Sequence, residues 1–204
     1  MENNDTPFTL RLITRHHDFL RPYIEAEMPL ARLVGPEQEA DYIVEIADPV
    51  YEPRPDASPG HALLMCPNVV GTGMELFPRR LAVKIGRGRF IHGTDSETPV
   101  ATVHAVDVAR AVRLTLGRKG IFYVTDTRTH TLGDLAEALA CRMGNLRLLH
   151  HRMPLIDRIV GSGVRRDLRL QQWYDGAAFA AEFGFNPVSV TEYLRTHVYD
   201  ESSL

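Results

Sequence analysis

Two short runs of almost unbroken apolar residues constrain the fold of this chain more than any other feature. They span residues 40–48 (ADYIVEIAD) and 61–71 (HALLMCPNVVG). A strand of a parallel sheet has this composition when both of its faces are covered, whereas a strand with one wet face alternates apolar and polar residues. Neither run approaches the length of a membrane-spanning helix. The two runs therefore predict neighbouring strands of a parallel sheet.

Helical patterns alternate with strand patterns along the rest of the chain. Asp107 is expected to cap a helix over residues 107–116, and Thr131 with Asp134 forms a capping box for the helix that follows. This alternation is typical of an α/β fold with a parallel sheet and helices on both faces. Further strands are predicted at residues 8–14, 89–94, 101–106 and 120–126, and further helices at 16–28, 74–86, 132–144 and on either side of 184–187.

Composition places the chain among ordinary globular proteins. It has 204 residues, 44% hydrophobic and 24% charged, with a net charge of -3. This charge does not favour nucleic acid or an anionic membrane as a partner. Cys66 and Cys141 lie in apolar runs and are expected to be reduced and buried. The polar N-terminus does not resemble a signal peptide, so a cytoplasmic location is expected.

Four motifs follow one another from Cys66 onward. A strand exit reads PNVVGTG (67–73), and VHAVDVA follows at 103–109. A strand-and-helix motif, GIFYVTDTRTHTLGDL, spans 120–135, and YDGAAFAAEFGFNPVSVTEYL spans 174–194. In this order they resemble the C-terminal half of the NAD-dependent epimerase/dehydratase family, the extended short-chain dehydrogenase/reductases.

The resemblance implies a truncated Rossmann-like parallel sheet with helices on both faces and a small C-terminal substrate-type lobe. Residues 1–204 are expected to form a single domain. Its sheet core should span about residues 7–130, and its lobe elements about 86–105 and 145–204. The strand at 8–14 and the two apolar runs should lie side by side, with the strand at 120–126 beyond them.

The first strand leads into a turn that departs from the family pattern. Family members carry TGxxGFIG there, so that the backbone can turn tightly and approach the cofactor pyrophosphate. In LITRHHDFLRPYI the three glycine positions hold Arg15, Asp18 and Arg21. Their side chains should fill the phosphate site, and Arg15 with Asp18 is expected to form a local polar network there. The family's cofactors, NAD or NADP, are therefore not expected to bind.

Two further family features are missing from the sequence. The family has two strands between its first helix and the strand that residues 40–48 resemble, whereas only residues 29–39 occupy that place here, and no strand is predicted in them. The family also carries a catalytic Tyr-x-x-x-Lys motif, and neither Lys84 nor Lys119 has a tyrosine four residues before it. Hydride transfer by the family mechanism is therefore not expected, and no catalytic residue is assigned.

By resemblance, a substrate-type pocket is expected at the carboxyl ends of the strands, where open α/β sheets bind ligands. Asn68, Thr72 and His92 would line its sheet side, and Arg165 or Arg169 would contact an anionic small molecule such as a nucleotide sugar. The alternative for the arginines is a solvated helical face.

Three other groups of residues have a functional and a structural interpretation. His104 and Asp107 could form a dyad, but a packed histidine and a helix cap are the more common roles. His150 and His151 could bind a metal, but adjacent strand residues face opposite ways and no third ligand is evident, so no metal is assigned. Trp173 and Tyr174 could form a stacking platform or part of a lobe core.

Three functions follow from these patterns. The first is a degenerate epimerase/dehydratase-like protein that acts as a binding or interaction module. The alternative is an epimerase-, dehydratase- or reductase-type enzyme that a partner chain completes, or one that uses altered chemistry. The third is a homo-oligomeric structural protein whose shortened sheet exposes an edge strand for pairing.

Overall fold

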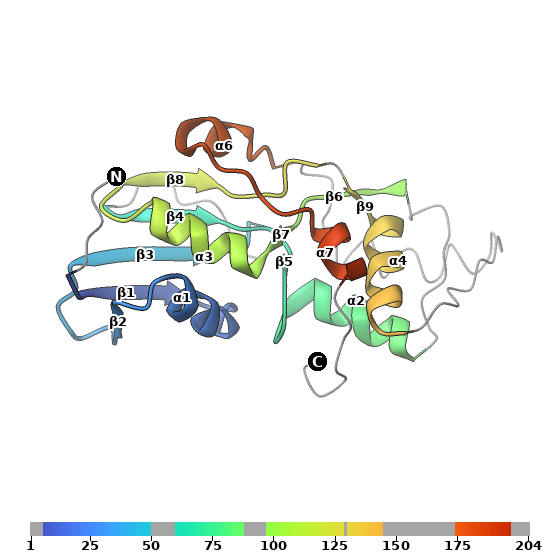
Figure 1. The fold of residues 1–204 in the computed structure, drawn as a ribbon, viewed down its shortest axis with the longest axis horizontal. Helices are drawn as coiled ribbons and strands as arrows, with labels where there is room; N and C mark the ends of the chain where they lie inside the picture. The colour runs from blue at the N-terminus through green and yellow to red at the C-terminus, as the bar shows by residue number, and fades with distance from the viewer. Residues whose placement is uncertain (1–5, 50–59, 88–96, 129, 145–173, 197–204) are drawn as a thin grey trace.

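The computed structural model describes residues 6–49, 60–87, 97–128, 130–144 and 174–196. A five-stranded sheet lies at the centre of one half of the molecule, and all of its strand pairs are parallel (Figure 1). Its order is β2-β1-β3-β4-β8, which confirms the predicted neighbours. The strands are β1 (Phe8–Thr14), β2 (Ala31–Val34), β3 (Tyr42–Ala47), β4 (Ala62–Met65) and β8 (Gly120–Tyr123).

Strand β2 corrects the sequence analysis, which predicted no strand between residues 29 and 39. It pairs with β1 from Phe8 opposite Ala31 to Arg11 opposite Val34. Helix α1 (Arg21–Glu27) connects the two strands. One of the two family strands that were expected to be missing is therefore present. The four residues of β2 are too few to show the alternation of apolar and polar side chains that marks a strand in a sequence. The strand is recognised by its pairing with β1.

One face of the sheet is covered by three helices, α1, α3 (Ala105–Leu114) and α6 (Ala177–Phe183). The core between them is aliphatic at β1, β3 and β4, and aromatic where Phe122 of β8 meets Phe179 and Phe183 of α6. A fully buried leucine or isoleucine contributes roughly 1.5–3 kcal/mol to such a core. Its fully buried side chains include Leu10, Leu20, Ile24, Ile46 and Leu64.

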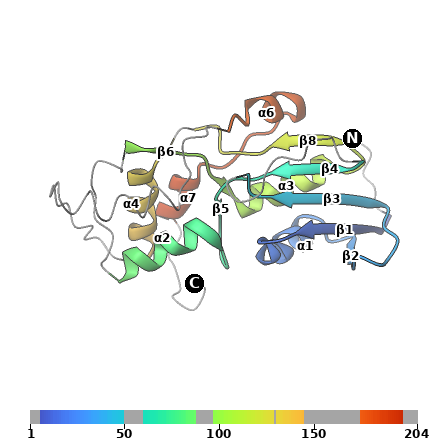
Figure 2. The same cartoon turned by 180° about the vertical axis from the view of Figure 1, so that it is seen from behind.

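The opposite face of the sheet carries no helix from the residues that the structure describes (Figure 2). A small cluster forms this face, with Ala47, Leu63 and Met65 buried and Ile121 and Tyr123 beside them. The fold class is confirmed as a truncated Rossmann-like α/β fold, and the expected helices are seen on one face.

A second hydrophobic cluster lies beyond the carboxyl ends of the strands. It is formed by α2 (Leu76–Gly86), α4 (Leu132–Arg142) and α7 (Val190–Thr196) (Figure 1). Two short ladders border it, β5 (Val69–Val70) with β7 (Val103–His104) and β6 (Pro99–Val100) with β9 (His130–Thr131).

The apolar run at 61–71 contributes to two sheets and is not the single strand that its sequence predicted. It forms β4 and, after a turn, β5. Asn68, in the turn, has a φ of 47°, which takes it out of the extended conformation. Asparagine tolerates this left-handed region better than most residues do.

The helix starts agree with the sequence in one case and correct it in another. The capping box of α4 is present, because Asp134 N–H donates to Thr131 Oγ1 at 3.1 Å and Thr131 N–H donates to Asp134 Oδ2 at 2.8 Å. Asp107 does not cap α3. The N-cap is His104, whose Nδ1 accepts from the Val106 N–H at 3.2 Å.

The two cysteines also differ. Cys66 is buried in the sheet core, where burial raises the pKa of its thiol, with Asp48 adding to this effect. Cys141 was expected to be buried and is exposed on α4. The apolar residues around it in the sequence face the second cluster, while Cys141 lies on the other side of the helix.

Candidate functional site

The turn after β1 is the first part of the candidate site. Strand β1 ends at Thr14, a single 3-10 turn follows over Asp18–Leu20, and α1 then begins at Arg21. Arg15, Asp18 and Arg21 all lie at the surface. Thr14 Oγ1 donates to Asp18 Oδ1 at 2.9 Å, and Arg21 Nε donates to Glu25 Oε1 at 2.9 Å. Asp18 therefore bonds with Thr14, and its predicted contact with Arg15 stays a prediction. The expectation that the three side chains fill the inside of the turn is wrong, since all three are exposed.

His17 fills the inside of this turn. Its side chain is only 2% exposed, and its carbonyl accepts from the Leu20 N–H at 2.9 Å. Its Nδ1 is buried and has no hydrogen-bond partner among the residues that the structure describes. Burial, together with His16, lowers the pKa of His17 to about 4, and Asp18 opposes this shift. His17 is therefore neutral at neutral pH.

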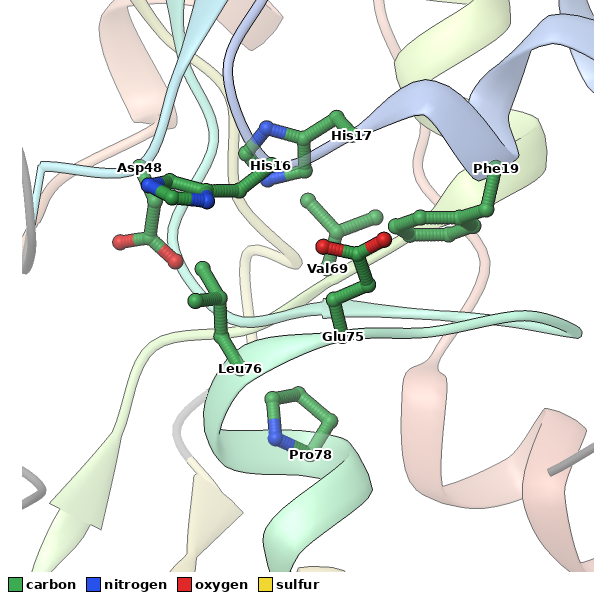
Figure 3. Close-up of a pocket in the computed structure, with 8 residues that line it drawn as sticks. All are labelled: His16, His17, Phe19, Asp48, Val69, Glu75, Leu76 and Pro78. Carbon is green, nitrogen blue, oxygen red and sulfur yellow. The ribbon is translucent and has the colours of Figure 1, made fainter.

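A shallow depression of about 170 Å³ lies beneath the turn (Figure 3). This volume includes space that is open to solvent, so the depression is a shallow hollow and not an enclosed pocket. It lies at the carboxyl ends of β1 and β3 and at the first turn of α2. Its lining residues are His16, His17, Phe19, Asp48, Val69, Glu75, Leu76 and Pro78.

Two carboxylates face the depression from outside the turn. Asp48 follows β3 and is fully buried, and its Oδ2 accepts from the Asn68 N–H at 3.1 Å. Glu75 is the N-cap of α2, and its side chain does not cap the helix. The next residue, Leu76, has a φ of 54°, which is unusual for a residue with a bulky side chain. Within the described ranges, no group of three or more His, Cys, Asp or Glu side chains is arranged to hold a metal.

The predicted substrate-type pocket is only partly visible. Asn68 is buried, and its Nδ2 donates to the Ala101 carbonyl at 2.9 Å, so it serves the turn between β4 and β5. Thr72 is exposed, and its N–H donates to the Tyr23 hydroxyl at 2.7 Å. Neither residue lines the depression. His92, Arg165 and Arg169 lie outside the described residues, as do His150, His151 and Trp173, so this pocket stays a prediction.

His104 is a packed histidine, the structural interpretation given above. Its ring lies 3.8 Å from that of Tyr193 and 6.4 Å from that of Tyr23, centroid to centroid. Asp107 lies in the first turn of α3 and accepts hydrogen bonds from Arg110 NH1 at 2.7 Å and from the Val188 N–H at 2.8 Å. Burial raises the pKa of Asp107, although these two partners oppose the shift. The contacts of Asp107 are thus those of a structural carboxylate.

A second buried carboxylate, Asp126, holds the chain at the start of α7. Its Oδ2 accepts from His130 Nε2 at 2.7 Å and from the Val190 N–H at 2.8 Å. Burial by itself would raise the pKa of Asp126, but the hydrogen bonds from His130 and from the Arg128 and Val190 N–H groups lower it below its usual value. Asp107 and Asp126 together anchor the chain at Val188 and Val190, where α7 begins and packs into the second cluster.

The sequence analysis missed the central residue of the site. The predicted helix over residues 16–28 includes His17 and gives it no role, because a histidine next to another histidine has no pattern that predicts burial. Tyr174 was assigned either to a stacking platform or to a lobe core. It stacks on Tyr123 of β8 at 5.6 Å, and its hydroxyl donates to the Pro49 carbonyl at 3.2 Å.

Among the described residues, no helix is long and apolar enough to cross a membrane.

Comparison with known proteins gives matches in structure but not in sequence. No family model and no curated protein matches the sequence. UDP-N-acetylglucosamine 4-epimerase from Bacillus cereus matches with a TM-score of 0.61 and 10% identity, over 92% of this chain and 94% of that one. GDP-L-fucose synthetase from Naegleria fowleri, bound to NADP, matches with a TM-score of 0.59 and 8% identity, over 94% and 93%.

A third structure is that of the Bordetella bronchiseptica enzyme WbmF in complex with NAD+ and UDP. It matches with a TM-score of 0.58 and 12% identity, over 93% of this chain and 91% of that one. Identities this low establish the fold alone. The chain therefore shares the fold of these epimerase and synthetase structures, which agrees with the fold that its sequence motifs predicted.

Proposed function

We propose that this protein is a degenerate epimerase/dehydratase-like protein that binds no dinucleotide and acts as a binding or interaction module. The observation that carries the proposal is the turn after β1. Side chains occupy the three positions where the family has glycine, and a buried histidine fills the inside of the same turn.

His17 supports this proposal more than the three other side chains do, because Arg15, Asp18 and Arg21 lie at the surface and do not fill the turn. A pyrophosphate needs backbone N–H groups that it can approach closely, and it needs space between the strand end and the following helix. The buried ring of His17 lies on the inside of this turn, and only a shallow hollow lies beneath it. Asp18 also places a carboxylate at the turn, where it would repel a phosphate.

The residue inventory gives independent support. Proton transfer by the family mechanism needs a tyrosine four residues before a lysine, and the sequence has no such pair. Tyr23, the tyrosine closest to the turn in sequence, accepts a hydrogen bond from the Thr72 N–H. Lys84 lies at the end of α2 and Lys119 immediately before β8, each preceded at the fourth position by a residue other than tyrosine.

Titration of the protein with NAD, NADH, NADP and NADPH tests the proposal. We expect no saturable change in melting temperature with any of the four. A bound ligand at 100 times its Kd would stabilise the fold by about 2.7 kcal/mol, a shift that thermal denaturation detects easily. Saturable stabilisation by any dinucleotide would refute the proposal.

UDP, a UDP-sugar and a GDP-sugar belong in the same titration, because WbmF was solved with UDP. If the module keeps an anionic small molecule as its ligand, one of these three should stabilise it without a dinucleotide. Turnover of a sugar nucleotide on addition of a co-purifying chain would instead favour the alternative function, an enzyme completed by a partner.

The predicted pocket can be tested with the double variant Arg165→Ala, Arg169→Ala. Its fold should be kept, because the proposal places both arginines at the surface, and exposed substitutions change stability by about 0.5 kcal/mol or less. Its affinity for any sugar nucleotide found above should fall at least tenfold. Arg79→Ala with Arg87→Ala is the matched control, since both are exposed arginines of the α2 region. Unfolding of the first double variant would show that its arginines are structural.

A further inference from the structure

The turn between β1 and α1 contains a buried nitrogen whose protonation the proposed function does not use. His17 is buried, yet its Nδ1 has no hydrogen-bond partner in the described part of the chain. A buried polar nitrogen without a partner costs free energy, and a buried charged one costs considerably more. The closed turn is thus more stable when the imidazole is neutral than when it is protonated.

We propose that His17 is a pH-sensitive plug, which holds the turn closed when neutral and releases residues 15–20 when it takes up a proton. The turn is suited to local opening because most of its side chains are exposed or half-buried. Its hydrogen bonds within the described residues include the Leu20 N–H to the His17 carbonyl, the Arg21 N–H to the Asp18 carbonyl and the Thr14 hydroxyl to Asp18. Neither the 3-10 turn nor α1 has a side-chain cap. Opening exposes the two buried side chains of the segment, His17 and Leu20, and needs no unfolding of the sheet.

The charged groups around the plug come from three elements. His16 and Asp18 flank His17 in the turn, Asp48 follows β3, and Glu75 starts α2. If a carboxylate bound the protonated His17 ring, it would hold the ring in the closed turn. Neither Asp48 nor Glu75 is hydrogen-bonded to Nδ1 of His17. Asp48 accepts the Asn68 N–H instead. Protonation therefore leaves a charge inside the turn without a bonded counter-charge at that nitrogen.

Opening of the turn would be transmitted to the second cluster through Phe19. The Phe19 ring lies 6.2 Å from that of His17, and its side chain packs against both the sheet core and the second cluster. Gly73 lies beneath it, where a Cβ would come within 3.0 Å of Phe19 Cβ. Release of His17 should thus loosen the contact between the sheet and the α2–α4–α7 cluster.

The size of the effect follows from proton linkage. The pKa of His17 is about 4 when the turn is closed, and it should return to its ordinary 6.5 when the turn opens. The open form therefore binds more protons between these values, so opening becomes easier as pH falls below 6.5. From pH 7 to pH 5 the open fraction should rise about twentyfold.

Hydrogen exchange of the full chain tests this directly, with protection factors corrected for intrinsic exchange at pH 7, 6 and 5. Amides of residues 15–24 should lose about twentyfold in protection, while those of β3 and β4 keep theirs. His17→Phe fills the turn but cannot take a proton, so it should remove the pH dependence. His16→Phe is the matched control and should behave as the original protein does.

Three results would overturn the plug. They are unchanged protection of residues 15–24, the same pH response in His17→Phe, or loss of the response in His16→Phe alone. If His17→Phe fails to fold, NMR titration of the histidine ring carbons in the unmodified protein decides the matter. A His17 pKa near 5 or below supports the plug, and a value near 6.5 contradicts it.

Discussion

At the scale of single residues, buried polar groups do most to fix the structure. Asp107 and Asp126 lie far apart in sequence from the segment that they anchor, and each accepts one backbone N–H from it. A hydrogen bond to a charged group is worth about 1.5–3 kcal/mol, and a donor left unpaired by its removal costs more. These carboxylates therefore hold the start of α7 against the rest of the protein.

Replacement of Asp126 by alanine should lower the free energy of unfolding by about 2–4 kcal/mol, since His130 and the Val190 N–H would both lose their acceptor. Urea unfolding measures the loss. Arg128→Ala is the control, because the Arg128–Glu192 ion pair is exposed and should contribute less than about 1 kcal/mol. A change below 0.5 kcal/mol for Asp126→Ala, by the precision of such measurements, would contradict an anchoring role.

At the scale of elements, local sequence and tertiary contacts share control of where helices begin. Helix α4 starts at a capping box that is complete within its own sequence. Helix α3 starts at a histidine that is also packed between Tyr23 and Tyr193. The start of α4 therefore depends on two residues that are three positions apart. The start of α3 depends on side chains from three separate elements.

Thr131→Ala should therefore cost about 1 kcal/mol, the usual value for a lost N-cap, and should act on α4. Thermal or urea unfolding gives the value. Cys141→Ala serves as the control on the same helix, because its side chain is exposed and alanine favours helix. Equal stability of the two variants would show that tertiary packing alone determines the start of α4.

At the scale of the whole molecule, two hydrophobic clusters meet at one partly buried aromatic ring. The sheet core and the α2–α4–α7 cluster both contact Phe19. Phe19 also belongs to the turn that replaces the glycine-rich loop. The turn after β1 therefore contributes a side chain to both hydrophobic clusters.

Phe19→Ala should lower the free energy of unfolding by about 2–3 kcal/mol, less than a fully buried phenylalanine would, because part of the ring is exposed. Phe19→Leu should recover most of the loss, since it restores apolar contact on both sides. Urea unfolding of the three proteins checks this order. Equal stability of Phe19→Ala and the original chain would show that the two clusters are joined elsewhere.

Restoration of glycine at positions 15, 18 and 21 tests whether the turn alone prevents dehydrogenase activity. The triple variant should show no oxidation or reduction of a nicotinamide cofactor with any sugar nucleotide, because the Tyr-x-x-x-Lys pair is still missing. It should also be less stable, since each glycine adds freedom to the unfolded chain. Cofactor-dependent turnover by this variant would refute the assigned loss of chemistry.

Fold class and the order of four of the five strands of the main sheet could be predicted from the sequence, and so could the capping box of α4. Apolar runs, capping boxes and motifs are local patterns, and an unbroken apolar run such as 40–48 is typical of a covered strand in a parallel sheet. Tertiary structure was needed to show that residues 31–34 form β2, that the run at 61–71 divides between two sheets, that His104 caps α3, that Cys141 is exposed and that His17 is buried. Each of these depends on contacts between residues that are distant in sequence. Burial depends on how the whole molecule packs. A short segment without helical or strand-like periodicity in its apolar residues therefore does not reveal which of its side chains are buried.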